Sequence, residues 1–281
     1  MIGAIIGDIV GSVYEFDNIK TKEFELFSEK STFTDDTVMS IAIAEFLMQD
    51  RQISQPRLCW HLNEWYKEYP HLHKTYGNNF TKWLYQFRNG NYANFKKSNS
   101  FGNGAAMRVS SLAELTADVR YTAKYVTEVS HNHPEGIKGA QAVAVACRLA
   151  KRNFSKEEIK KIIEKEFKYK LKRSVYLLRK TYEYNETCQA TVPEAIICFL
   201  ESTDFEDAIR NAISIGGDSD TLACITGSIA ENFYKEIPDW IMKEAVGRLT
   251  NEIKDVLKEY YTRNLYEKKS VAKKVLLLLG N

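Results

Sequence analysis

The chain has 281 residues, 44% of them hydrophobic, so it is long enough to bury a substantial core as one large domain or two. Its 39 basic and 37 acidic residues leave a formal net charge of +2, which gives no reason to expect a nucleic-acid or membrane partner. Five widely spaced cysteines without a C-x-x-C pair argue against a disulfide framework and a zinc site. We therefore expect a protein of the reducing cytoplasm.

The first segment, "MIGAIIGDIVGSV", is apolar but too short to cross a bilayer, lacks a basic start and contains Asp8, so it is not read as a signal peptide. Gly3, Gly7 and Gly11 recur every four residues and would line one face of a helix. Such a face lets another backbone approach closely. We predict a tightly packed central helix.

An irregular stretch, residues 14–33, follows this helix and leads to the acidic cluster "TFTDDTVMSI". A loop of this kind beside a charged site is a candidate lid. Asp35 and Asp36 begin the next apolar helical segment, where one carboxylate would suffice to cap the free N–H groups. The surplus charge indicates either a cation site or simple capping with solvent screening.

Two further stretches, "YGNNFTKW" and "RNGNYANFKKSNSFGNGAAMR", contain Gly and Asn residues that favour turns. In the second, Gly102 and Gly104 permit close backbone approach before a helix, so the loop could hold a phosphate or could simply start the helix. Arg108 could meet a phosphate or, as is commoner, an internal carboxylate. In "SHNHPEG", His131 or His133 could line a pocket, although loop histidines are more often solvated or capping.

The second half of the chain is dominated by helical patterns. "PEGIKGAQAVAVACRLAKR" predicts an alanine-rich central helix, and "SKEEIKKIIEKEF" opens on a capping box of Ser155 and Glu158. Thr203 and Glu206 predict a second box, with Gly216 and Gly217 as the stop of that helix. Pro238 opens what we predict to be one long amphipathic helix, with an apolar stripe from Ile241 to Tyr260. No strand pair is evident, so the simplest fold is a single all-α domain over residues 1–281.

A second acidic cluster, "GGDSDTLAC", begins the helix after Gly217. Taken with the first cluster, it completes an all-oxygen set without His or Cys: Thr34, Asp35, Asp36, Asp218, Asp220 and Thr221. Hard cations prefer such sets, so Mg²⁺ or Mn²⁺ fits better than zinc, and four carboxylates could hold two ions.

Other acidic signatures fit these residues poorly. The D-D-x-x-D run of terpenoid synthases would need an aspartate where Met39 stands. An EF-hand loop fails because "DSDTLACITGSI" becomes apolar after Thr221, and a phosphoryl-transfer D-x-D-x-T motif would need Thr in place of Leu222.

Five stretches in order resemble the ADP-ribosylglycohydrolase family, which includes ADP-ribosylserine and ADP-ribosylarginine hydrolases and the dinitrogenase reductase activating glycohydrolase. They are "GAIIGDIVGSVYEF", "TDDT", "FGNGAAMR", "SHNHPEG" and "GGDSDT", within residues 1–235. The resemblance implies an all-α orthogonal helical bundle with two Mg²⁺ ions, held by Thr34, Asp35, Asp36, Asp218, Asp220 and Thr221. The ions would hold the distal ribose of ADP-ribose beside the bond that is cut.

The same resemblance implies the remaining roles. Glu15, on the candidate lid, would transfer a proton or position the scissile linkage, a metal-bound water would attack, and Asp36 or Asp220 would act as base. The substrate, ADP-ribose on a protein or a small molecule, would lie against Gly102, Asn103, Gly104, Ala105 and Met107, with His131 or His133 nearby. Serine, arginine and O-acetyl linkages all stay open. The alternative function is a non-catalytic sensor that binds ADP-ribose or a nucleotide and keeps the dinuclear metal site. A monomer is favoured.

Overall fold

The computed structural model describes residues 1–49, 53–263 and 270–280. Within these residues every regular element is a helix, apart from one isolated antiparallel bridge between Gly102 and Thr187, so the all-α prediction is confirmed. In chain order the elements are α1 Ile2–Gly11, α2 Asp35–Gln49, α3 Gln55–Glu68, η1 Pro70–Leu72, α4 Asn78–Leu84, η2 Tyr85–Phe87, α5 Gly104–Met107, α6 Leu112–Leu115, α7 Val119–Thr127, α8 Pro134–Lys151, α9 Lys156–Phe167, α10 Val175–Thr181, α11 Cys188–Leu200, α12 Phe205–Ser214, α13 Ser219–Tyr234, α14 Asp239–Gly247, α15 Asn251–Arg263 and α16 Ser270–Leu278.

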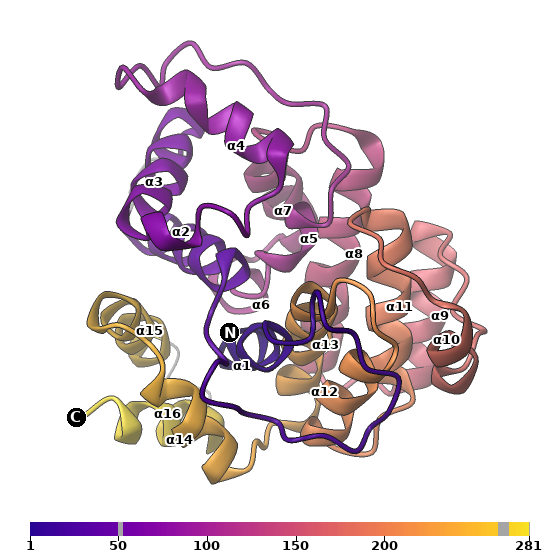
Figure 1. Cartoon of the computed structure of the whole chain (residues 1–281). Coiled ribbons are helices and arrows are strands. Elements are labelled where there is room, and N and C mark those ends of the chain that lie inside the picture. Colours follow the sequence, from indigo (N-terminus) through magenta and orange to yellow (C-terminus); the bar gives the residue numbers. More distant parts are fainter. Residues whose placement is uncertain (50–52, 264–269, 281) are drawn as a thin grey trace.

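Helices α1 and α13 pack against each other at the centre of the molecule (Figure 1). Every residue of α1 is buried, and its three glycines face α13. A Cβ on Gly7 would lie 2.0 Å from the carbonyl oxygen of Ala223, and one on Gly11 would lie 2.4 Å from the Cα of Asp220. The predicted close-packing glycine face is therefore confirmed, and it brings the end of α1 directly onto the start of α13.

The other helices surround this central pair. Helices α2, α3 and α4 lie on one side, α8 to α11 on the other, and α14 to α16 form a third group (Figure 1). One hydrophobic cluster runs through all three groups, as the predicted single domain requires. In the described parts of the chain, no helix is long and apolar enough to span a bilayer. All five cysteines are buried and free.

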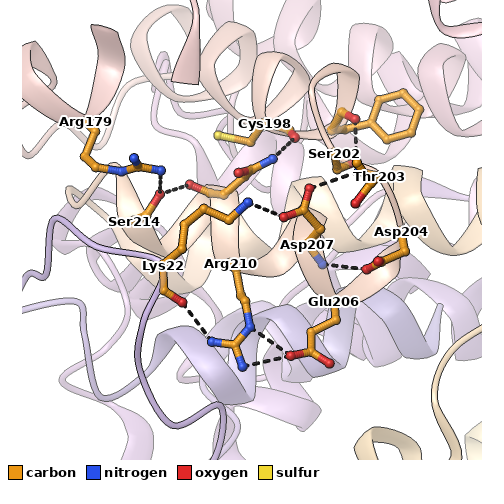
Figure 2. Close-up of polar contacts among 12 residues, drawn as sticks. Lys22, Arg179, Cys198, Ser202, Thr203, Asp204, Glu206, Asp207, Arg210 and Ser214 are labelled. Atoms are coloured by element: carbon orange, nitrogen blue, oxygen red, sulfur yellow. Dashed lines mark hydrogen bonds and ion pairs between the residues drawn. The ribbon is translucent and has the colours of Figure 1, made fainter. Parts of the chain in front are cut away.

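The predicted capping of two helices has mixed outcomes. The box of Ser155 and Glu158 at the start of α9 is confirmed, with both reciprocal hydrogen bonds present. The box at α12 is shifted by one residue, because Asp204 rather than Thr203 accepts the N–H of Asp207, at 2.8 Å. Figure 2 shows this contact and the return bond from the Thr203 N–H to Asp207. A carboxylate one residue later replaces the predicted hydroxyl cap.

The prediction of one long helix after Pro238 is wrong. Helix α14 ends at Gly247, and α15 starts at Asn251. Hydrogen bonds between residues three apart end α14, from the Arg248 N–H to the Ala245 carbonyl and from the Leu249 N–H to the Val246 carbonyl, at 3.1 and 3.2 Å. The turn prediction around "YGNNFTKW" is also incomplete, since α4 occupies most of it.

Residues 12–34 connect α1 to α2 without a helix, in agreement with the predicted irregular stretch. Figure 1 shows this loop passing over α13 and α12 before it reaches α2. It therefore lies beside the start of α13.

Candidate functional site

Three helices bring aspartates to one place. Asp8 comes from the middle of α1, Asp36 from the start of α2 and Asp220 from the start of α13. One carboxylate oxygen from each of these three lies within 4.8 Å of the others. A second group, within the same distance, joins Glu15 and Asp218 to Asp220. The two acidic stretches thus meet in space, and the loop glutamate meets them.

The threonines beside the aspartates link the helices. The Thr34 hydroxyl lies 3.3 Å from a carboxylate oxygen of Asp220, and the Thr221 hydroxyl lies 3.3 Å from a carboxylate oxygen of Asp36. The other oxygen of Asp36, Oδ1, is buried without a hydrogen-bond partner among the described residues. A buried carboxylate oxygen without a donor is costly unless a cation or water supplies the missing contact.

Asp8 is a site residue that the sequence alone marked only as evidence against a signal peptide. It is fully buried, and it accepts hydrogen bonds from the Thr34 N–H and hydroxyl at 2.9 and 2.7 Å. The Thr37 N–H, at 3.1 Å, and the Thr37 hydroxyl also donate to it. The available signal was a lone carboxylate inside an apolar, glycine-spaced run, since a buried charge of that kind requires partners.

The carboxyl groups strongly perturb one another. Burial raises the pKa of Asp36 and of Asp220 well above the usual range, and the neighbouring carboxylates, Asp8 for the former and Asp218 for the latter, raise each further. Burial raises the pKa of Asp8 to about 6, against the opposing effect of its threonine donors. Crowded carboxylates of this kind are stabilised by a divalent cation, and their all-oxygen chemistry suits Mg²⁺ or Mn²⁺.

A cavity of about 550 Å³ opens beside these carboxylates. Most of the residues that the sequence pointed to line it: Glu15, Asp35, Asp36, Gly102, Asn103, Gly104, Met107, His131, Asp218, Asp220 and Thr221. Thr34 lies beneath this lining, bonded to Asp8. Ala105 and His133 are outside the lining, and His133 instead caps α8 by accepting the Glu135 N–H at 3.1 Å.

The glycine-bearing loop contacts the acidic centre through Asn103. Its side-chain amide donates to the Asp218 carboxylate at 2.7 Å and to the Thr191 hydroxyl at 3.1 Å. The Asn103 backbone N–H donates to the Glu186 carbonyl at 2.8 Å, which fixes the loop against the chain before α11. The helix that follows, α5, has only 4 residues.

Arg108 and His131 form a buried pair beside the same loop, since a Cβ on Gly104 would lie 3.4 Å from the His131 Nε2. Arg108 donates to the Ser130 hydroxyl at 2.6 Å and lies 3.3 Å from Nδ1 of His131. Both side chains also lie against the ring of Phe80. Burial and the Arg108 charge hold the pKa of His131 well below its usual range, so this imidazole is neutral at physiological pH. Among the residues that the structure describes, Arg108 therefore hydrogen-bonds a hydroxyl and an imidazole rather than the internal carboxylate that is commoner.

Glu15 is held at the mouth of the cavity by residues that the sequence analysis did not identify. The Tyr184 hydroxyl lies 3.3 Å from the Glu15 carboxylate and 3.0 Å from that of Glu186. The ring of Phe16 stacks on Tyr184, with 6.3 Å between centroids. Tyr184 and Glu186 lie in an irregular segment without a motif, so no local pattern could have marked them.

The fold and this cavity define an all-helical protein whose central helices share a carboxylate-rich centre. The chain belongs to the ADP-ribosylglycohydrolase family, whose model matches residues 1–273, and it is accordingly a hydrolase. It is 25% identical to ADP-ribosylhydrolase ARH3 of Gallus gallus over 94% of this chain and 93% of that protein. The human ADP-ribosylhydrolase ARH3 is 24% identical over 83% of this chain and 84% of its own.

Two other similarities extend this comparison. A putative ADP-ribosyl glycohydrolase of Acanthamoeba polyphaga mimivirus is 25% identical, over 86% of this chain and 88% of its own. A solved ADP-ribosylglycohydrolase-related protein complex is 20% identical, with a TM-score of 0.61 over 99% of this chain and 95% of that chain. This structural similarity supports the fold alone.

Proposed function

We propose that this protein cleaves the glycosidic bond between the distal ribose of ADP-ribose and a modified side chain or acyl group, releasing ADP-ribose. The observation that carries the proposal is the meeting of Asp36 and Asp220 within 4.8 Å, with Glu15 beside Asp220 in the same cavity. The relatives named as ADP-ribosylhydrolases support the choice of substrate. Serine, arginine and O-acetyl linkages are all compatible with this centre.

We propose two Mg²⁺ ions as cofactors, with Mn²⁺ as the alternative, held by Thr34, Asp35, Asp36, Asp218, Asp220 and Thr221. The partnerless Asp36 Oδ1 and the crowding of buried carboxylates support this assignment. When bound, such ions would neutralise the carboxylates and orient the ribose hydroxyls. Asp8 is placed to orient one of these ligands, since it binds both the N–H and the hydroxyl of Thr34.

Glu15 is our candidate for proton transfer to the leaving group. Its carboxylate lines the cavity, lies beside Asp218 and Asp220, and is oriented by the Tyr184 hydroxyl. Asp36 or Asp220 would accept a proton from the water that attacks the ribose. In this assignment the general acid, Glu15, lies on the loop, and the general base lies at the start of α2 or of α13.

The remaining substrate contacts follow from the lining. Gly102, Asn103, Gly104, Met107 and His131 line the cavity and would contact the diphosphate and ribose. Ala105 and His133 are outside the lining, and only the family resemblance supports a binding role for them. The neutral His131 would act as a stacking or hydrogen-bonding group and not as a cation.

Defined conjugates of ADP-ribose test the proposal. Serine-linked, arginine-linked and O-acetyl ADP-ribose would each be incubated with the protein, first with Mg²⁺ and then with EDTA, and free ADP-ribose measured by chromatography. We expect release from at least one conjugate with Mg²⁺ and none with EDTA. Stoichiometric binding of ADP-ribose without release from any conjugate would indicate a sensor and would refute the proposal.

A further inference from the structure

The side chain of Asn18 joins the loop that carries Glu15 to the turn that carries Asp218, and beside it the Ser219 hydroxyl lies 3.2 Å from the carbonyl oxygen of Tyr14. We infer that Asn18 is a positioning residue, which fixes the Glu15 carboxylate relative to Asp218 and Asp220. The inference rests on the proposed role of Glu15, and it adds a residue that neither the acidic motifs nor the family assignment contains. Asn18 touches none of the reacting groups itself.

The carboxamide of Asn18 is occupied on both sides. Its Nδ2 group lies 2.7 Å from the carbonyl oxygen of Tyr14, 2.8 Å from that of Glu15 and 2.9 Å from that of Gly217. Its Oδ1 accepts the Gly217 N–H at 2.6 Å. The Asn18 side chain therefore hydrogen-bonds the carbonyl of Glu15 and both the N–H and the carbonyl of Gly217. Asparagine suits this position because it has a donor and an acceptor in one rigid plane.

The two glycines of "GGDSD" shape the turn that Asn18 contacts. Gly216 and Gly217 have φ values of +69° and +83°, which favour glycine. A Cβ on Gly216 would lie 3.0 Å from the Asn18 Oδ1 and 2.9 Å from the Lys20 Nζ. The turn is therefore shaped to receive the loop, and the ammonium of Lys20 reaches past it to the carbonyls of Tyr182 and Ile215.

The next part of the loop is anchored separately. Figure 2 shows Lys22 paired with Asp207 of α12, and Arg210 reaching the carbonyl of Lys22. Arg210 also binds the carbonyl of Phe24, at 2.8 Å, and lies over its ring. The tip of the loop lacks such an anchor at Phe16, whose side chain is 82% exposed. Loss of Asn18 would thus loosen residues 15–17, while the bonds of Tyr14 to Gly11, Glu25 and Ser219 and the contacts of α12 with residues 22–24 remain.

The position of Glu15 depends on this tether because its carboxylate contacts only the Tyr184 hydroxyl among the hydrogen bonds of the described residues. Tyr184 is itself 42% exposed, so it orients Glu15 without fixing its backbone. A shift of about 1 Å in a catalytic group can cost about 100-fold in rate. Asn18 supplies a restraint on the backbone of Glu15 itself, through the Glu15 carbonyl.

The test compares Asn18→Ala and Asn18→Asp with wild type on whichever conjugate the wild type cleaves. The Asp variant keeps an acceptor for the Gly217 N–H but loses the amide group that donates to the carbonyls of Tyr14, Glu15 and Gly217. We expect kcat to fall about 10- to 100-fold in both variants, with KM and Mg²⁺ affinity within about 2-fold of wild type. Hydrogen exchange should accelerate at the Gly217 amide in the Ala variant, because Asn18 accepts this N–H, while α13 stays protected. Asp17→Asn, one residue away and exposed, is the matched control and should retain wild-type kcat.

Each outcome decides the matter. An unchanged kcat in either folded variant would overturn the inference. A loss of Mg²⁺ affinity equal to the loss of kcat would also overturn it, because it would indicate a structural role in the metal centre. If Asn18→Ala unfolds, the Asp variant carries the test alone. A wild-type protein that releases no ADP-ribose from any conjugate would refute the proposed function, whereas active wild type with active Asn18 variants would refute only the role of Asn18.

Discussion

The carboxylate of Asp8 in α1 accepts both the N–H and the hydroxyl of Thr34, at 2.9 and 2.7 Å, across 26 residues of chain. This contact ties the central helix to the segment that leads into α2. It also orients the Thr34 hydroxyl toward Asp220, 3.3 Å away. The fully buried Asp8 carboxylate therefore positions Thr34 within the acidic centre.

Asp8→Asn should weaken metal binding, because Asp8 orients Thr34, one of the proposed metal ligands. An amide in this place would turn a donor toward the threonine donors, so Thr34 would lose its orientation. We expect Mg²⁺ affinity, measured by calorimetry, to fall about 10-fold or more. Thr37→Val is the control, because it removes one donor to Asp8 but leaves both bonds from Thr34. Equal Mg²⁺ affinity in Asp8→Asn and wild type would contradict an orienting role.

Glu15→Gln should abolish turnover but leave binding intact. The amide keeps the size of the side chain but cannot transfer a proton, so we expect kcat to fall about 100-fold or more. ADP-ribose and Mg²⁺ affinities, measured by calorimetry, should stay near wild type. Glu23→Gln, exposed on the same loop, should behave as wild type. A Glu15→Gln variant with full kcat would remove Glu15 from the mechanism.

His131 should make the protein less stable in mild acid. Burial and the Arg108 charge hold its pKa well below the ordinary 6.5, so the unfolded chain takes up a proton below pH 6.5 that the folded protein does not. The free energy of unfolding should therefore fall as the pH drops, by up to about 1.4 kcal/mol per pH unit from this group. Denaturant titrations at pH 7.5, 6 and 5 should show a shallower fall for His131→Asn, which keeps an acceptor for Arg108. Parallel curves for the two proteins would contradict this assignment.

Gly7→Ala should severely destabilise the fold. The added Cβ would lie 2.0 Å from the Ala223 carbonyl, and both helices are fixed by the core around them. We expect a loss of roughly 3 kcal/mol or more, measured by denaturant unfolding. Gly247→Ala is the matched control, because nothing lies within 4 Å of its Cβ position and alanine is the better helix residue. Similar stabilities for the two variants would refute the close packing of α1 on α13.

The sequence predicted those parts of the site whose signal is local. Asp35 with Asp36 and Asp218 with Asp220 are adjacent or nearly so, and the glycine spacing in α1 has a fixed period, so each pattern is visible in a short window. Asp8 had only the signal of a lone carboxylate inside an apolar run, and Tyr184 had none. Their partners are Thr34 and Glu15, 26 and 169 residues away, so only the packing of the chain shows their roles.

The break between α14 and α15 shows a different limit. Ile241, Ala245, Leu249 and Ile253 are all buried, so the apolar period continues across the break. Periodicity reports which face meets the core, and both helices meet the same core. It does not report that one helix ends at Gly247 and the next begins at Asn251.

Crystals of the protein grown with Mn²⁺ give the most direct test of the acidic centre, through the anomalous scattering of the metal. The account predicts anomalous peaks within coordination distance of the carboxylates of Asp36 and Asp220, and their loss in crystals of Asp36→Asn. Peaks elsewhere, or an Asp36 and an Asp220 whose side chains point into separate surroundings with no metal between them, would contradict it.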